Sequence, residues 1–231
     1  CWRFSKRIML IALSGFSGKM GESIRELAVH SHEIVDFKSA DLQKNKPDAT
    51  IDFSSPDQSL KVIKSCLELK IPLVIGTTGL NSNHLAEISD ASNKIPICLD
   101  ANFSPGVHKL ISNIEAFLTS AQGKITGITI NEIHHTNKVD APSGTALMIQ
   151  KNIQERFSDL NLKFNMHSER KGDAFGIHQV SLLGNESIVC TFEHKAENRG
   201  IFADGAIKAA KLLINKKPNL YSIKDFLPDL L

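Results

Sequence analysis

IMLIALSGFSGKMG, at residues 8–21, carries the clearest indication of fold class in this chain. Its first half is a short apolar run, which predicts a buried strand over residues 8–14. Its second half places three glycines at GxxGxxG spacing before a segment with helical periodicity, residues 18–29. Glycines at such a turn let a pyrophosphate approach the N–H groups of the helix. The turn alone is weak evidence, because a purely structural strand–helix turn uses glycine in the same way.

Short β-type runs and helical patterns alternate through the first hundred residues. They predict strands at residues 33–37, 49–53, 72–75 and 95–99, and helices at residues 56–69 and 82–92. Repeated units of this kind imply a parallel sheet with helices on both faces, an α/β fold of the Rossmann-like type. Such sheets bind ligands at the carboxyl ends of their strands. The alternation therefore favours dinucleotide binding at the glycine turn.

The pattern changes after residue 104. An apolar helical stripe and a series of longer β-type runs follow, at residues 107–118, then 124–133, 163–169, 176–183 and 186–194, with a last helical segment at 203–215. Gly184-Asn185 between the last two runs is a hairpin signal. These patterns predict a smaller α+β domain with a mostly antiparallel sheet. We therefore expect a dinucleotide-binding domain of residues 1–104 and 205–231, and a substrate-binding domain of residues 105–204.

The composition is that of an ordinary globular protein. Of 231 residues, 42% are hydrophobic and 23% are charged, and the net charge of +2 is too small to indicate a nucleic-acid partner. No apolar run approaches the roughly 18 residues that a membrane span needs. The cysteines at positions 1, 66, 98 and 190 are too dispersed for a metal site, so reduced cysteines of a cytoplasmic protein are expected. Because the chain opens on Cys1, Met9 is a candidate natural start.

The run EIHHTNKVDAPSGT, at residues 132–145, indicates the chemistry of the second domain. Its first nine residues hold two imidazoles, an ammonium and two carboxylates. Ser143 is a good N-cap for the helical pattern that follows, and the N–H groups of Gly144 and Thr145 would attract an anion at the helix start. This combination predicts a site for a small acidic substrate that gains or loses a proton.

The two histidines of this run stand side by side at the end of a predicted strand. The side chains of His134 and His135 therefore point to opposite sides, and no third ligand stands at metal-type spacing, so no metal site is predicted. A lone histidine is usually structural, but Lys138 and the helix start nearby favour a functional site. Asp140, which precedes Ala141-Pro142, is expected to shape the loop.

Further cofactor contacts are expected at strand ends. Asp36 could bond an adenosine ribose and Lys38 a 2′-phosphate, although ordinary surface charge is the commoner role of both. This segment does not choose between NAD and NADP. The loops GTTG, at residues 76–79, and DANFS, at residues 100–104, also fall at the carboxyl edge of the predicted sheet. As isolated segments, both loops are more often plain turns.

Taken together, these motifs resemble those of the dihydrodipicolinate reductases, also called 4-hydroxy-tetrahydrodipicolinate reductases. The HHxxKxDAPSGT pattern of residues 134–145 resembles the long signature of that family. Other segments are similar in the expected order, at residues 15–21, 51–54, 76–79, 101–107, 170–178 and 194–206. The resemblance covers nearly the whole chain.

The resemblance implies an oxidoreductase of lysine and diaminopimelate biosynthesis that uses NADPH or NADH to reduce 4-hydroxy-tetrahydrodipicolinate to tetrahydrodipicolinate. It implies that His134 donates the proton, with Lys138 as its cationic partner. The substrate carboxylates would be held by His135, Ser143, Gly144 and Thr145. The candidate cofactor residues are Gly15, Phe16, Ser17, Gly18, Lys19, Met20, Asp36, Lys38, Gly76, Thr77, Thr78, Asp100, Ala101, Asn102 and Phe103. The family forms tetramers through the sheets of its second domain, so a homotetramer is expected.

Two other functions stay compatible with parts of the sequence. Another nicotinamide enzyme on the same two-domain plan, such as an amino-acid dehydrogenase, would use the glycine loop without the Ser-Gly-Thr cradle. A cofactor-binding sensor would bind NAD(P)H without turnover. The basic clusters at residues 170–178 and 194–199 could face a dicarboxylate or stay solvated. The segments 21–51 and 153–163 look short for the family.

Overall fold

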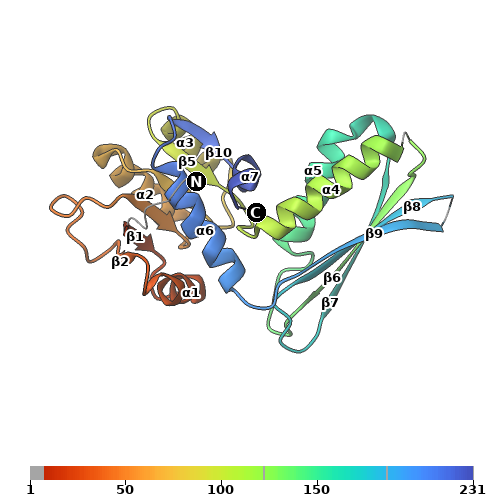
Figure 1. The fold of residues 1–231 in the computed structure, drawn as a ribbon, viewed down its shortest axis with the longest axis horizontal. Helices are drawn as coiled ribbons and strands as arrows, with labels where there is room; N and C mark the ends of the chain where they lie inside the picture. Colours follow the sequence, from red (N-terminus) through yellow and green to blue (C-terminus); the bar gives the residue numbers. More distant parts are fainter. Residues whose placement is uncertain (1–7, 122, 186, 231) are drawn as a thin grey trace, which may run out of the picture. The chain divides into compact units, whose positions relative to one another are not determined.

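A computed structural model describes residues 8–121, 123–185 and 187–230 of the chain. These residues divide into two compact units (Figure 1). The first unit contains the described residues up to Ser104 together with those from Gly200 onward, and the second unit contains Pro105–Arg199. Cys1 lies outside the described residues. Of the other cysteines, Cys66 and Cys98 are buried and Cys190 is half-buried, all as free thiols.

The first unit is built on a parallel six-stranded sheet with the strand order β10-β5-β4-β3-β1-β2. The strands are β1 (Leu10–Ser14), β2 (Glu33–Asp36), β3 (Ala49–Asp52), β4 (Leu73–Ile75), β5 (Pro96–Leu99) and β10 (Asn219–Tyr221). The predicted Rossmann-like sheet is thereby confirmed. Only β10 was not predicted, because its three residues are largely exposed and follow a Lys-Lys-Pro break.

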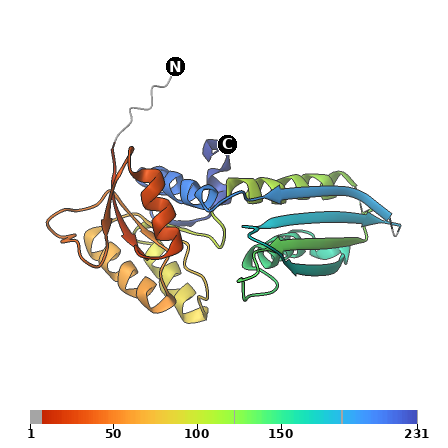
Figure 2. The same ribbon diagram turned by 90° about the horizontal axis from the view of Figure 1, so that it is seen from below.

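Helices cover both faces of this sheet (Figure 2). On one face lie α1 (Lys19–Ala28), α6 (Gly200–Leu213) and the short C-terminal helices η2 (Ile223–Phe226) and α7 (Leu227–Leu230). On the other face lie α2 (Pro56–Leu69) and α3 (Ser82–Ser92), both with the predicted bounds. The connection from β2 to β3 has no helix, so this crossover is a short irregular loop.

The second unit is a four-stranded sheet with the order β7-β6-β8-β9. Its strands are β6 (Gly127–His134), β7 (Lys163–Arg170), β8 (Ile177–Gly184) and β9 (Ser187–Lys195). Two of the three strand pairs are antiparallel, which confirms the predicted mostly antiparallel sheet. The exception is the parallel pair β6–β7, since α5 (Gly144–Arg156) and the turn η1 (Ser158–Leu160) connect these strands as a crossover. In the β8–β9 hairpin, Asn185 takes the left-handed conformation at φ +49°.

One face of the second sheet, the inner face, packs against α4 (Pro105–Ala121) and α5 (Figure 1). Side chains alternate between the two faces of a strand, so Ile128 and Ile130 of β6 and Val180 and Leu182 of β8 are buried on the inner face. Their core is completed by the apolar sides of the two helices. By the same alternation, Glu132 and His134 of β6 and His178 of β8 lie on this face.

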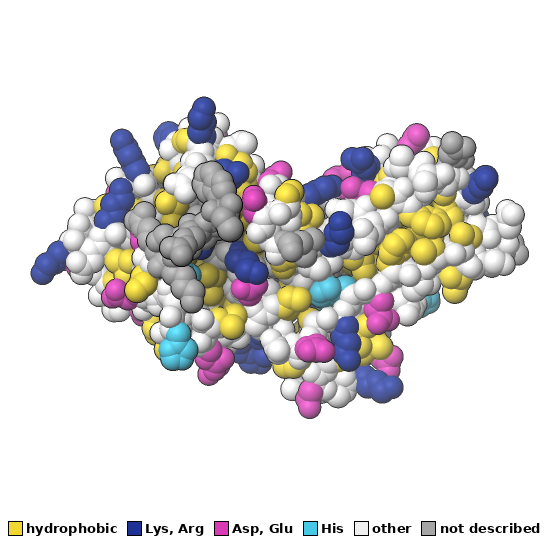
Figure 3. Space-filling view, viewed as in Figure 1, with side chains coloured by type: hydrophobic (Ala, Val, Ile, Leu, Met, Phe, Trp, Pro, Cys, Tyr) yellow, Lys and Arg dark blue, Asp and Glu magenta, His cyan; other side chains and the backbone are white. Residues whose placement is uncertain are grey.

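Among the described residues, no helix is both long and apolar enough to span a membrane. On the face drawn in Figure 3, lysine and arginine side chains are spread out and interspersed with acidic ones. This distribution agrees with the small net charge of +2.

Candidate active site

The inner face of the second sheet turns polar at the end of β6. Glu132 and His134 continue the face that is apolar earlier in the strand, and both are buried. The register places Glu132 between Ser168 of β7 and His178 of β8, and it pairs His134 with Arg170 of β7. Residues from three strands, up to 46 positions apart in the sequence, therefore meet at one end of the sheet.

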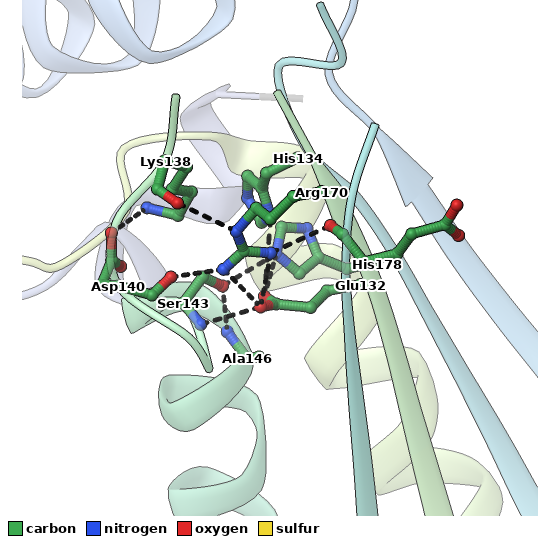
Figure 4. A network of polar contacts seen from close by, with 9 residues as sticks. Glu132, His134, Lys138, Asp140, Ser143, Ala146, Arg170 and His178 are labelled. Atoms are coloured by element: carbon green, nitrogen blue, oxygen red, sulfur yellow. Dashed lines mark hydrogen bonds and ion pairs between the residues drawn. The ribbon is translucent and has the colours of Figure 1, made fainter. Parts of the chain in front are cut away.

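The Glu132 carboxylate is the centre of this group (Figure 4). Its Oε1 accepts the backbone N–H of Ser143 at 3.0 Å and lies 3.4 Å from both Nη1 and Nη2 of Arg170. Its Oε2 has no hydrogen-bond partner in the described part of the chain. That oxygen faces two imidazoles, at 3.7 Å from Nδ1 of His134 and 3.7 Å from Nε2 of His178. One oxygen of the carboxylate thus contacts the guanidinium of Arg170, and the other faces the imidazoles of His134 and His178.

Arg170 ties the loop after β6 to this carboxylate. Its Nε donates to the carbonyl oxygen of Lys138 at 3.2 Å, and its Nη2 donates to the carbonyl oxygen of Asp140. A third bond, from Nη1, reaches the carbonyl oxygen of Glu169 at 3.0 Å. The guanidinium therefore fixes the loop that carries the predicted cation. Its five donors suit this role better than a lysine would.

The two imidazoles lie edge to face with their ring centroids 5.0 Å apart. Burial lowers the pKa of His178 to about 3, and the nearby charges of His134 add to this shift. Burial also lowers the pKa of His134; Glu132 opposes this shift, while Lys138 and Arg170 reinforce it. Without a bound anion both rings are therefore largely neutral at neutral pH.

Glu132 itself stays ionised despite its burial. Burial by itself raises the pKa of this carboxyl, but the neighbouring hydroxyls of Ser143 and Ser168, the N–H of Ser143 and the attraction of His134 lower it below its ordinary value. A buried carboxylate that accepts several hydrogen bonds keeps its charge in this way. The site therefore contains a permanent negative charge next to the predicted proton donor.

Ser143 is the N-cap of α5, as predicted. Its Oγ accepts the backbone N–H of Ala146 at 3.1 Å and lies 3.3 Å from Nε2 of His178. Gly144 follows at the exposed start of the helix, and a Cβ at that position would meet no atom within 4 Å. The helix N-terminus is thus fixed to the imidazole cluster and leaves room for an anion beside it.

Lys138 lies in the loop with its Nζ 2.7 Å from Oδ1 of Asp140. Partial burial by itself raises the pKa of Asp140, but the hydrogen bond and charge of Lys138 outweigh this and lower it. The pair thus stays ionic and holds the lysine side chain in place. His135 lies just beyond β6 and is half-buried, and its carbonyl oxygen accepts the N–H of Lys138 at 3.1 Å.

Three of these side chains have ligand types and spacing that a metal ion could use. One ligand atom each from Glu132, His134 and His178 lies within 4.8 Å of the others. The spacing in sequence did not indicate this set, because His178 comes from another strand. Arg170 already offsets the charge of Glu132, and the nearby Lys138 opposes a further cation. The chemistry of the group therefore favours proton handling, and the absence of a resident metal stays a prediction.

The glycine turn of the first unit is packed too tightly to accept side chains at two of its glycines. Gly15 has φ +85°, and a Cβ there would lie 2.2 Å from the carbonyl oxygen of Phe53. Its carbonyl oxygen accepts the N–H of Gly18, which caps α1 without a side chain. A Cβ on Gly21 would lie 2.3 Å from the same oxygen of Gly15. The turn is therefore tight, and Lys19 and Met20 follow at the bare helix start.

Two cavities lie beside this turn in the first unit. The larger, about 730 Å³, is lined by Leu10, Phe16, Glu33, Val35, Asp36, Ser39, Ala40, Asp41 and Asn45. The smaller, about 250 Å³, is lined by Gly15, Phe16, Ser17, Asp36, Lys38, Ser54, Ser55 and Gln58. Asp36 and Phe16 line both, and the Asp36 carboxylate also accepts the backbone N–H of Lys38 at 3.1 Å. Five of the cofactor candidates thus border one continuous region of the fold.

The loop after β4 is held by a buried carboxylate that sequence reasoning did not single out. Asp52, at the end of β3, accepts hydrogen bonds from the hydroxyls of Ser54, Ser59 and Thr77. Thr77 Oγ1 also accepts the N–H of Ser54 at 3.1 Å. A Cβ on Gly76 would fall 2.1 Å from the Phe53 ring. The predicted loop with Gly76 and Thr77 is therefore fixed to the neighbouring strand end, with Thr78 exposed beside it.

The loop after β5 is held by hydrogen bonds and aromatic packing within the first unit. Asp100 accepts the N–H of Asn102 at 3.2 Å and that of Ile223 at 3.0 Å. Phe103 is buried edge to face against Phe53, at 5.5 Å between ring centroids. Ala101 is the exposed residue of this segment. These contacts place the loop at the carboxyl edge of the sheet, and its part in cofactor binding stays a prediction.

Glu132, Arg170 and His178 are the site residues to which sequence reasoning assigned no role. The alternation of a strand could have placed Glu132 on the same face as His134, because they are two residues apart. Arg170 and His178 join them only through the register of β7 and β8. Of the remaining basic clusters, Arg199 lies 5.2 Å above the Phe175 ring and Lys195 ends β9.

Models of one protein family match most of the chain. The model described as dihydrodipicolinate reductase, N-terminus, matches residues 31–103, and the one described as dihydrodipicolinate reductase, C-terminus, matches residues 106–227. A curated 4-hydroxy-tetrahydrodipicolinate reductase of Haloarcula marismortui is 32% identical over 250 residues, covering 93% of this chain and 97% of its own length. That of Bdellovibrio bacteriovorus is 35% identical over 225 residues, covering 94% and 95%.

Solved structures share the fold. A dihydrodipicolinate reductase from Paenisporosarcina sp. TG-14, solved with dipicolinate bound, superposes with a TM-score of 0.76 at 21% identity and covers 95% of this chain and 99% of its own. A probable dehydrogenase from Thermotoga maritima reaches a TM-score of 0.61 at 11% identity, with 96% and 93% covered. At these identities the structures support the fold class alone.

Proposed function

This chain belongs to the dihydrodipicolinate reductase family, and from that premise we propose how its residues perform the reaction. It is an oxidoreductase that reduces 4-hydroxy-tetrahydrodipicolinate to tetrahydrodipicolinate in lysine and diaminopimelate biosynthesis. The substrate, one reduced nicotinamide and one proton give the product, the oxidised nicotinamide and one water. The substrate hydroxyl leaves as that water together with a proton from the adjacent ring carbon, a hydride adds to the conjugated imine that remains, and a proton quenches the negative charge that develops.

His134 donates the proton. The observation that carries this assignment is its burial at the end of β6, beside the permanent charge of Glu132 and next to the loop that holds Lys138. Since its pKa lies below 6.5 in the free protein, the ring needs an anion nearby to charge at neutral pH. A dicarboxylate substrate supplies two negative charges. Lys138 stabilises the developing charge and contributes to substrate binding.

The substrate carboxylates bind at the start of α5. Ser143, Gly144 and Thr145 form the first turn of that helix, where N–H groups attract an anion. His135 contributes from the end of β6. The dicarboxylate dipicolinate bound to the Paenisporosarcina protein is consistent with a substrate of this class. Each such charge-assisted hydrogen bond is worth about 2 kcal/mol.

The pyridine nucleotide binds along the carboxyl edge of the first sheet, and when bound it supplies the hydride. The tight turn at Gly15 leads into the N-terminus of α1, which has no side-chain cap and suits its pyrophosphate. Gly76, Thr77, Thr78 and residues 100–103 serve the nicotinamide end. At the adenosine end, Glu33, Asp36 and Asp41 all line the larger cavity, so NADH binds better than NADPH. Lys38 in the smaller cavity moderates this preference, and NADPH is also accepted.

The assembly is a homotetramer of a cytoplasmic protein, with residues 105–204 as the substrate-binding and oligomerisation domain. The edge strand β9 exposes Ile188 and Val189 by 65% and 54%, which suits burial in an interface. Mass measurement in solution tests this part directly. Residues 1–104 and 205–231 form the dinucleotide-binding domain.

The proposal is tested by following the absorbance of NADH and NADPH with enzymatically generated 4-hydroxy-tetrahydrodipicolinate. Turnover with this substrate and none with amino or keto acids is expected. His134→Gln should retain dinucleotide binding and lose about 100-fold or more in kcat, the range of a general acid. A His134→Gln variant with unchanged kcat would remove His134 from the mechanism.

A further inference from the structure

One oxygen of the buried Glu132 carboxylate, Oε2, has no hydrogen-bond partner among the described residues. In a buried site, a carboxylate oxygen without a hydrogen-bond partner is costly, so its neighbours matter. It lies 3.7 Å from Nδ1 of His134 and 3.7 Å from Nε2 of His178. Both distances are just longer than a hydrogen bond, and a small movement of either ring closes the contact.

We propose that Glu132 positions the proton donor by keeping one proton on Nδ1 of His134, so that Nε2 is the atom that takes up and delivers the exchangeable proton. This inference rests on the proposed role of His134 in reduction. The Nδ1 atom points at a permanent negative charge and has no other partner in the described residues. A carboxylate in this place favours the N–H form of the facing nitrogen and stabilises the ring when it becomes charged.

The opposite side of the ring fits delivery from Nε2. Gly176 has φ +150°, and a Cβ there would lie 3.2 Å from Nε2 of His134 and 3.3 Å from Cε1 of His178. The chain therefore has no side chain at the position that faces the delivering nitrogen. After delivery, the neutral ring keeps its Nδ1 proton, and Nε2 takes the next proton from water.

His178 is a second imidazole next to the same oxygen, but it does not compete for the charge. Burial keeps it neutral, with a pKa of about 3, and its Nε2 also lies 3.3 Å from the hydroxyl of Ser143. His194, directly opposite it on β9, is half-buried, and this burial lowers its pKa. Glu132 and Lys138 act on both His134 and His178, but Asp140 of the loop and Arg170 of β7 also act on His134.

The charges around His134 come from every element packed against it. Glu132 of β6 and Asp140 of the loop favour its charged form, whereas Lys138 of the loop and Arg170 of β7 oppose it. His178 of β8 lies against the ring as a neutral group. Removal of the Glu132 charge therefore leaves two cations near the ring, and the protonated form becomes rarer.

The first measurement is made on the wild-type protein, and a single variant, His134→Gln, is used to assign the signals. Long-range proton–nitrogen NMR spectra of protein with ¹⁵N-labelled histidine report which ring nitrogen carries the proton, and the signals lost in His134→Gln identify His134. For neutral His134 in the wild-type protein we expect the Nδ1–H form. The Nε2–H form would overturn the inference. This readout does not depend on turnover, so a protein without reductase activity but with the Nδ1–H form would contradict only the proposed function.

The second measurement uses Glu132→Gln, which keeps the shape of the side chain. Its amide can donate to Nδ1 and should convert neutral His134 to the Nε2–H form, with a fall in kcat of about 100-fold. The pH at which kcat declines should move to lower values. Glu169→Gln removes the same charge from an exposed position on β7 and should leave kcat and the tautomer unchanged. If Glu132→Gln keeps both the Nδ1–H form and the wild-type pH profile of kcat, Glu132 does not position the proton. If that variant fails to fold, the wild-type spectrum still decides.

Discussion

The guanidinium of Arg170 on β7 contacts the buried carboxylate of Glu132 on β6, with Nη2 and Oε1 3.4 Å apart. The same guanidinium bonds the carbonyl oxygens of Lys138 and Asp140. The position of the loop that carries Lys138 and the charge balance of Glu132 therefore depend on one side chain.

Replacement of Arg170 by methionine should lower both the reductase activity and the stability of the protein. The buried Glu132 would lose its charge partner, which costs about 3 kcal/mol of unfolding free energy, and the loop with Lys138 would lose two of its anchors. We expect kcat/KM to fall more than 10-fold, as measured by initial rates, and the denaturation midpoint to fall. Lys171→Met, at the neighbouring exposed position, is the matched control and should leave both unchanged. Equal effects of the two changes would contradict the anchoring role.

The pH profiles of kcat/KM and kcat should differ in a defined direction. Proton donation needs protonated His134, so activity declines as the pH rises through its pKa. In the free enzyme, burial keeps that pKa below 6.5, and kcat/KM reports the free enzyme. The bound dicarboxylate raises it, so kcat should decline at a higher pH than kcat/KM. Initial rates over a pH series measure both, and a kcat profile that declines at the lower pH would rule out the proposed charge coupling.

His178 should make the second unit sensitive to acid. Its pKa is about 3 in the folded protein and about 6.5 when unfolded, so its contribution to stability is complete above pH 6.5 and is lost as the pH falls toward 3. In that window each extra proton bound by the unfolded chain lowers the unfolding free energy by about 1.4 kcal/mol per pH unit. His178→Asn should flatten this dependence in urea unfolding followed by circular dichroism. His134 and His194, whose pKa values are also lowered, account for the slope that stays.

Gly176→Ala should block the delivering face of His134 without a change in charge. The added Cβ would meet Nε2 of His134 at 3.2 Å, and φ +150° is unfavourable for alanine. We expect kcat/KM to fall about 10-fold or more while dinucleotide affinity, measured by fluorescence titration, stays the same. Gly172→Ala provides the control, since Gly172 also has a positive φ of +54° but its Cβ would meet nothing within 4 Å. Similar losses in both variants would point to backbone strain in place of steric blocking.

Much of the fold could be predicted from the sequence, because its signals are local. Helices α2 and α3 have the predicted bounds, since their apolar periodicity and the proline or asparagine at their starts are read directly from neighbouring residues. The cap of α5 at Ser143 follows from the same kind of signal. Strand β10 was missed because three residues, two of them exposed, are too few to show a periodicity.

The site was predictable only in its contiguous part. His134, Lys138 and Ser143 lie within one run, and the family signature marks them. Glu132 and His178 come together through the antiparallel register of β6 and β8, which no spacing in the sequence reveals. The same holds for the three hydroxyls that converge on Asp52 in the first unit. Their roles required the pairing of strands that are distant in the chain.

The parallel pairing of β6 and β7 makes the tolerance of this chain to insertions and deletions uneven. Arg170 reaches Glu132 because both strands run the same way and keep one register over eight residue pairs. The connection between Arg156 and Lys163 lies outside the strand pairing, so it can gain or lose residues without a change of register. A single residue inserted within β7 before Arg170 would turn that guanidinium to the opposite face of the sheet. Length variation among functional variants of this chain should accordingly be found in the connection and be absent from the strand.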